Sequence, residues 1–166
     1  MGPKKGATSA VGNSPSPSTL VVDHGGYAIK ANLTSVPEPK YIPNCVTKSK
    51  NMQNRIFVGD QLQECKDFSG LFYQYPFQRG YLVNWELEKQ IWDQMLSADC
   101  LDLNIDAHSD LTLVISEPPF NFHQLREPAI EVAFEEFGFS NFFTTMRKLL
   151  SFSRFLHVLN AEFPNS

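Results

Sequence analysis

The chain has 166 residues, of which 42% are apolar and 19% charged, and a formal net charge of −4. This balance is typical of one globular domain, and 14 phenylalanines predict an aromatic core. Because the chain is acidic, we expect no direct sequence-specific binding of nucleic acid. No apolar run approaches the roughly 20 residues of a membrane helix, so we expect no membrane partner. Three widely spaced cysteines form no metal-binding or disulfide pattern.

The first 18 residues predict a disordered arm. They consist mainly of Gly, Pro, Ser and Lys, and Ser14 to Pro17 repeat a Ser-Pro pair that favours extended backbone. The folded part is expected to begin after this segment.

Thr19 to Leu33 predict a β-hairpin, because two alternating apolar segments flank the pair Gly25 and Gly26. The tip has what a phosphate site needs. The glycines allow close approach of the backbone to an anion, Asp23 is a carboxylate for a metal or its waters, and Lys30 supplies a positive charge. An ordinary turn between two core strands is the alternative interpretation.

Several short elements are expected next. Tyr41 to Val46 predict a third strand interrupted early by proline, and Thr47 to Arg55 predict an exposed polar loop. Ile56 to Val58 predict a strand followed by a short polar helix that runs through Cys65. A further strand is expected to end at Tyr75.

A helix is predicted from Trp85, with Asn84 as its N-cap. The apolar positions that follow a helical face are Trp85, Leu87, Ile91, Trp92, Met95 and Leu96. The charged positions Glu86, Glu88 and Lys89 are expected to face water.

Asp99 to Asp110 alternate acidic and polar residues as a calcium loop does. Counted from Asp102, the sixth position of the loop is Ala107 instead of glycine, and the twelfth is Leu113 instead of glutamate. Both are decisive positions, so the sequence favours a solvated loop over a metal site.

The remainder alternates strands and helices. Leu111 to Ile115 predict a buried strand, Asn121 to Phe137 a helix stopped by Gly138, Phe139 to Phe143 another strand, and Met146 to Leu159 a last helix. This order is typical of an α/β fold.

Several segments, in order, resemble the N-terminal part of actin. They are Leu20 to Gly26 with Lys30, Val58 to Asp60, Tyr75-Pro76, Gly80 to Trp85, Ile91-Trp92 and Ser116 to Pro118. Within the actin superfamily the chain is most similar to the sixth class of nuclear actin-related proteins. That similarity rests on Ile42 to Cys45, Ser69 to Tyr73, Pro76 to Trp85 and Ser116 to Phe122.

The resemblance covers about Leu20 to Phe143 and implies an actin-like, ribonuclease-H-like α/β fold. We expect its N-terminal half only, a mixed sheet with flanking helices over residues 19–144, with a small inserted region at about 44–68. Residues 145–166 are expected to form a divergent, helical C-terminal tail. The chain has Arg79 where actin has histidine and a shorter exposed loop, which both argue against a filament-forming protein.

The resemblance also implies the cofactor-binding residues Asp23, Gly25, Gly26, Tyr27 and Lys30. Lys30 would reach a phosphate and Asp23 would order the waters of a magnesium ion. His24 and Gly26 stand where actin has other polar side chains. No second phosphate loop follows Gly80, so we assign no catalytic and no metal-binding residue to this chain. ATP with magnesium is implied for a full-length protein and not expected for this chain alone.

The function implied is that of a truncated, non-enzymatic actin-related protein. It would be a structural or interaction subunit of a nuclear chromatin-remodelling complex that exchanges a variant histone. Its partners would be other subunits of the remodeller and, indirectly, the nucleosome and its histones; its location would be the nucleus, with the cytoplasm as an alternative. Two other hypotheses stay open: a nucleotide-binding ATPase or kinase-like member of the superfamily, and a truncated product without function.

Overall fold

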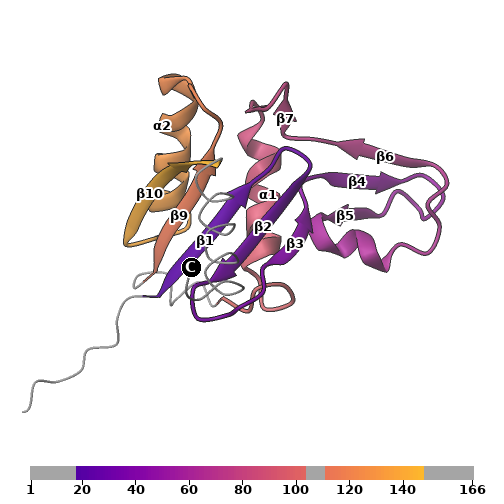
Figure 1. Cartoon of the computed structure of the whole chain (residues 1–166). Helices are drawn as coiled ribbons and strands as arrows, with labels where there is room; N and C mark the ends of the chain where they lie inside the picture. The colour runs from indigo at the N-terminus through magenta and orange to yellow at the C-terminus, as the bar shows by residue number, and fades with distance from the viewer. Residues whose placement is uncertain (1–17, 104–110, 148–166) are drawn as a thin grey trace, which may run out of the picture.

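The computed structural model describes residues 18–103 and 111–147 (Figure 1). The predicted arm over residues 1–18 lies outside this part except for Ser18. The tail helix predicted from Met146 is wrong at its start, because Thr145 and Met146 belong to the last strand of the sheet, and the rest of it beyond Arg147 lies outside the described residues. Most of the acidic segment around residues 104–110 also lies outside.

The fold is built on a five-stranded mixed sheet with the strand order β10-β9-β1-β2-β3. Strands β10, β9 and β1 run parallel, whereas β1, β2 and β3 are antiparallel neighbours. Their bounds are β1 Thr19–His24, β2 Ala28–Leu33, β3 Lys40–Pro43, β9 Thr112–Glu117 and β10 Asn141–Met146. The α/β mixed sheet expected from the sequence is therefore confirmed.

The predicted hairpin over Thr19 to Leu33 is also confirmed. Strands β1 and β2 pair so that Asp23 lies opposite Lys30 and His24 opposite Ile29. The segment Gly25 to Tyr27 makes the turn. Because β1, β9 and β10 are parallel, their carboxyl ends reach the same edge of the sheet as this turn.

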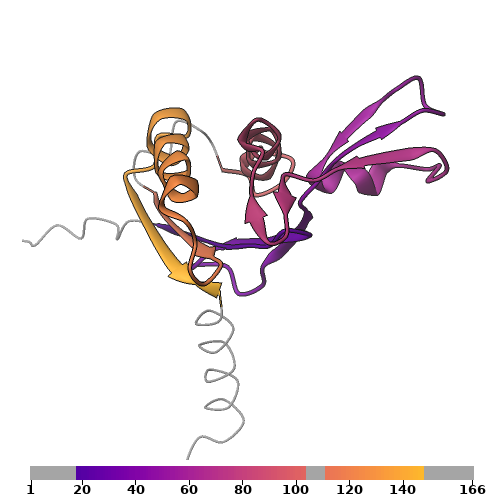
Figure 2. The same ribbon diagram turned by 90° about the horizontal axis from the view of Figure 1, so that it is seen from above.

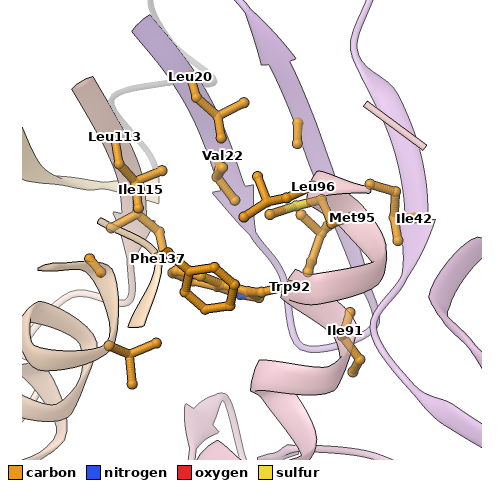
Figure 3. Close-up of a cluster of buried hydrophobic side chains, with 14 of the residues drawn as sticks. Leu20, Val22, Ile42, Ile91, Trp92, Met95, Leu96, Leu113, Ile115 and Phe137 are labelled. Atoms are coloured by element: carbon orange, nitrogen blue, oxygen red, sulfur yellow. The ribbon is translucent and has the colours of Figure 1, made fainter. Parts of the chain in front are cut away.

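Both described α-helices, α1 Trp85–Leu96 and α2 His123–Glu131, cover the same face of the sheet (Figure 2). Along β1 the buried residues alternate with half-buried ones, and Leu20 and Val22 point toward the helices. Asp23 and its partner Lys30 therefore lie on the sheet face away from the helices. Figure 3 shows the core between sheet and helix α1, where the Trp92 and Phe137 rings lie 5.6 Å apart.

A three-stranded arm projects from the main sheet (Figure 1), with the strand order β5-β4-β6. Its elements are β4 Val46–Ser49, β5 Ile56–Val58, the 3-10 helix η1 Gly59–Glu64 and β6 Leu71–Gln74. A small hairpin of β7 Phe77–Gln78 and β8 Tyr81–Leu82 then leads into α1. The segment 44–68, expected as an insertion, falls in or beside this arm.

The prediction of one strand over Tyr41 to Val46 is wrong. The structure splits it into β3 of the main sheet and β4 of the arm, with a break at Asn44 and Cys45. Asn44 is fully buried and donates hydrogen bonds to the β1–β2 turn, which takes it out of strand pairing. The exposed loop expected from Thr47 accordingly begins later, after Ser49.

Helix α1 begins as predicted, because Asn84 Oδ1 accepts a hydrogen bond from the Leu87 N–H at 3.1 Å. Most of its predicted apolar face is buried. The buried residues are Leu87, Ile91, Trp92, Met95 and Leu96, and Trp85 packs against this cluster.

The expectation that Glu88 faces water is wrong, because its side chain is completely buried. Glu88 Oε1 lies 2.5 Å from Nε2 of His24 and accepts a hydrogen bond of 2.9 Å from Trp92 Nε1. A buried carboxylate needs such partners to offset its lost hydration. His24 is 64 residues away along the chain, so helical spacing alone gave no sign of it.

The second helix is shorter than the predicted span of Asn121 to Phe137. After α2, the chain widens into a π-helical turn, η3 Val132–Glu136. Val132 and Ala133 of this turn are buried, whereas α2 itself contributes no fully buried side chain. Gly138 follows at a positive φ of 66°, the stop that the sequence predicted. No helix within the described ranges is long and apolar enough to cross a membrane.

A polar cluster joins β3, η1 and the segment after α1. Lys40 Nζ lies 3.3 Å from Asp60 Oδ2 and donates to the Cys100 carbonyl at 3.1 Å. Burial, and secondly the neighbouring Asp60 carboxylate, raise the pKa of the Cys100 thiol from 9.0 to about 11, against the opposing effect of Lys40. The thiolate of Cys100 is therefore scarce at neutral pH.

Replacing Glu88 by alanine should destabilise the fold by about 3 kcal/mol, because His24 and Trp92 would be left buried without their partner. Glu86→Ala on the same helix is the matched control, since that side chain is exposed and its loss should cost less than about 0.5 kcal/mol. Urea unfolding followed by tryptophan fluorescence measures both. Equal midpoints for the two variants would contradict the prediction.

We expect the rate constant for alkylation of Cys100 by iodoacetamide to rise about ten-fold per pH unit from pH 8 to pH 10. The measurement uses a variant with Cys45→Ser and Cys65→Ser, so that Cys100 is the thiol that reacts. The raised pKa keeps the thiolate fraction rising over this range, whereas an ordinary thiol levels off near its pKa of 9.0. The same variant unfolded in urea is the control. A plateau above pH 9 in the folded protein would contradict the assignment.

Candidate functional site

The candidate site lies at the tip of the β1–β2 hairpin, where the carboxyl ends of the three parallel strands meet. Strand β1 brings Asp23 and His24 to this edge, β2 brings Lys30, and β9 brings Ser116. Arg147 follows directly after β10. Topology therefore gathers side chains that are up to 124 positions apart in the sequence.

Asp23 is the centre of the site. Its Oδ1 accepts a hydrogen bond of 2.8 Å from the Ser116 hydroxyl and lies 3.7 Å from Arg147 Nε. Its Oδ2 lies 3.8 Å from Lys30 Nζ. One carboxylate is thus held between two cations and a hydroxyl group, and the cluster of three charged groups carries a net charge of +1.

Ser116 and Arg147 also fix the backbone of the hairpin. The His24 N–H donates to Ser116 Oγ at 2.9 Å, and Arg147 Nη2 donates to the His24 carbonyl. These contacts tie β9 and the end of β10 to the last residue of β1. The position of Asp23 is therefore set from both sides of the strand end.

The turn itself is held by Asn44. The Asn44 side-chain amide donates to the Gly25 carbonyl and its backbone N–H donates to the Tyr27 carbonyl, both at 2.9 Å. At Gly25 a Cβ atom would lie 2.3 Å from the Ala28 carbonyl oxygen, so a residue with a side chain does not fit there. At Gly26 a Cβ would lie 3.2 Å from the Phe77 side chain.

The structure thus brings together most of the predicted site residues. Asp23 and Lys30 are in direct contact, Gly25 and Gly26 form the adjacent turn, and Tyr27 ends that turn with a largely exposed side chain. Whether these residues bind a nucleotide stays a prediction. The described ranges contain no group of three or more His, Cys, Asp or Glu side chains placed to hold a metal ion.

Sequence reasoning did not identify Ser116 and Arg147 as site residues. The sequence places Ser116 within a family motif and Arg147 in the predicted tail. The signal that could have found them is strand direction. A residue at or just after the carboxyl end of a strand that runs parallel to β1 lies at the same edge of the sheet as Asp23. Using it requires knowing that β9 and β10 pair in parallel with full register.

A hollow next to this cluster lies between the sheet and the helices. Its lining includes the polar residues His24, Ser116 and Arg147 and apolar residues such as Trp85 and Leu125. Arg126 crosses its rim with a two-pronged ion pair to Glu117, with Nη2–Oε1 and Nε–Oε2 distances of 2.6 and 2.9 Å. The negative charge of Glu117 is thereby balanced locally.

Comparison with known proteins agrees with this architecture. The chain is 38% identical over 135 residues to "Actin-related protein 6" of Drosophila melanogaster, covering 81% of this chain and 33% of the relative. It is 39% identical over 128 residues to "Actin-like protein ARP6" of Cryptococcus neoformans, covering 76% and 25%. "Actin-related protein 6" of Dictyostelium discoideum is 33% identical over 132 residues, covering 79% and 26%.

The chain thus spans between a quarter and a third of the length of these relatives. The model of the family "Actin" matches residues 14–156, which extends beyond Phe143, where the resemblance noted in the sequence ended. This match includes every residue of the cluster around Asp23. The chain belongs to the actin family.

Proposed function

We propose that this actin-related chain acts as a non-enzymatic interaction subunit of a nuclear chromatin-remodelling complex that exchanges a variant histone. The similarity to proteins named actin-related protein 6 supports this proposal, together with the class-specific segments of the sequence. Its direct partners would be other subunits of the remodeller, and it would approach histones through them. The corresponding location is the nucleus.

The observation that carries an interaction role is the apolar surface of the arm. Phe72 on β6 and Ile56 on β5 both pair with Lys48 of β4, so they lie on the same face of the arm, with 59% and 55% of their surface exposed. Phe68, which precedes β6, is 62% exposed, and Tyr73 on the opposite face of β6 is 40% exposed. Large apolar side chains gathered on a projecting element are typical of surfaces that other proteins cover. The arm is therefore the part of the described structure best suited to hold a partner.

The electrostatic state of Asp23 supports a non-enzymatic role. Phosphoryl transfer needs groups that position the attacking water and the phosphates from several sides. Asp23 is instead engaged by Lys30, Arg147 and Ser116, which are contacts that hold the hairpin tip together. We assign no catalytic residue to the described part of the chain.

A second candidate function is nucleotide binding without turnover. The specific observation in its favour is the pair of cations, Lys30 and Arg147, beside Asp23 at the glycine turn, since positive charge suits a phosphate group. Both functions can coexist, because the arm and the turn lie on different parts of the molecule.

A tagged form of the chain should recover the variant histone and the remodeller ATPase from nuclear extract, identified by mass spectrometry. Phe72→Ser should reduce this recovery at least five-fold, because it removes exposed apolar surface from the arm. Val36→Ser, at another exposed apolar position, is the matched control and should recover both proteins normally. Recovery of cytoskeletal proteins instead would contradict the proposal.

Lys30→Gln should weaken ATP binding about ten-fold, because it removes one charge-assisted contact to phosphate. Equilibrium dialysis at millimolar ATP measures the affinity. Lys48→Gln on the arm is the control, since it makes the same change in net charge at an exposed site. If wild-type protein binds no ATP at these concentrations, the second candidate function is wrong.

A further inference from the structure

We propose that the turn at Asp23 to Tyr27 is a metal-independent phosphate site, in which Arg147 supplies the positive charge beside Asp23 that a magnesium ion would otherwise supply. This inference rests on the second candidate function, phosphate binding at the hairpin tip. It concerns which form of a nucleotide the site takes: the free tetra-anion instead of its magnesium complex.

The carboxylate of Asp23 is already in contact with three neighbouring groups. A magnesium ion held through Asp23 would use its oxygens directly or through ordered waters. Oδ1 already accepts the Ser116 hydroxyl at 2.8 Å and faces Arg147 Nε at 3.7 Å, and Oδ2 faces Lys30 Nζ at 3.8 Å. A hydrated magnesium ion at Asp23 would therefore add two positive charges beside two cations that already share this carboxylate, which is electrostatically unfavourable.

The charged side chains at the hairpin tip carry more positive than negative charge. Lys30 and Arg147 contribute two positive charges against one negative charge on Asp23, which leaves +1 at the tip. Glu117, a nearby acidic residue, is neutralised by its ion pair with Arg126. Glu88 pairs with His24 in the core on the helix side of the sheet. The tip therefore attracts an anion without a bound metal ion.

The Arg147 side chain is held in place before any ligand binds. Arg147 is anchored by its contact with Asp23 and by its hydrogen bond to the His24 carbonyl, and its backbone follows directly after β10. Less side-chain freedom is lost when such an arginine contacts a phosphate than when an unanchored one does. A Cβ at Gly25 would meet the Ala28 carbonyl oxygen and one at Gly26 the Phe77 side chain, so the compact turn beside this cluster leaves little room for any residue but glycine.

The test compares ATP binding to the full 166-residue chain in excess EDTA and in excess magnesium chloride. Amide NMR shifts of Gly25 and Gly26 report the site, so catalytic activity is not needed. Wild-type protein should bind ATP in EDTA at least as tightly as in magnesium. Arg147→Gln should lose about ten-fold in affinity in EDTA and should bind more tightly when magnesium is added, because Asp23 is then freed for the ion.

Two further variants complete the design. Arg147→Lys keeps the charge and should retain most of the affinity in EDTA. Arg55→Gln makes the same change in net charge on the arm, where Arg55 pairs with the exposed Glu64, and should behave as wild type. NMR spectra of each variant without ATP confirm that it is folded.

The outcomes separate the two hypotheses. ATP binding that requires magnesium in the wild-type protein would overturn this inference and leave nucleotide binding intact. Absence of ATP binding in both conditions would overturn both. Unchanged affinity of Arg147→Gln in EDTA would also overturn the role of Arg147.

Discussion

The fold depends on the buried contact between His24 and Glu88, which joins the last residue of β1 to helix α1. The carboxylate also accepts the Trp92 indole N–H, so one oxygen of Glu88 ties together the hairpin and the helix. A buried carboxyl group in this position is tolerated only with such partners, and its loss would leave the polar groups of His24 and Trp92 without partners in the core. The contact therefore fixes where the strand ends and the turn at Gly25 begins.

From that fixed point the geometry of the site follows. His24 points into the core on one face of the sheet, so its neighbour Asp23 must point to the other face, where Lys30 lies opposite it. Strand β9 pairs in parallel with β1, and β10 pairs in parallel with β9. Ser116 and Arg147 therefore lie at the same edge of the sheet as Asp23. A glycine turn beside one carboxylate and two cations is the product of core packing and strand direction together.

The two proposed roles use different parts of this framework. The arm, with its exposed aromatic side chains, projects away from the main sheet (Figure 1) and offers a surface for protein partners. The hairpin tip offers a site for phosphate.

The sequence by itself determined the hairpin, the N-cap at Asn84, the order of the α/β elements and the resemblance to the actin family, because local periodicity and short motifs report these. Only the tertiary structure decided the break at Asn44, the burial of Glu88 and the placement of Arg147 beside Asp23. Glu88 looked like a surface residue since helical spacing assigns faces but not partners. Its partner, His24, lies 64 positions away in the sequence, and Asp23, the partner of Arg147, lies 124 positions away. Such contacts form only when the strands pair and the helices pack on the sheet.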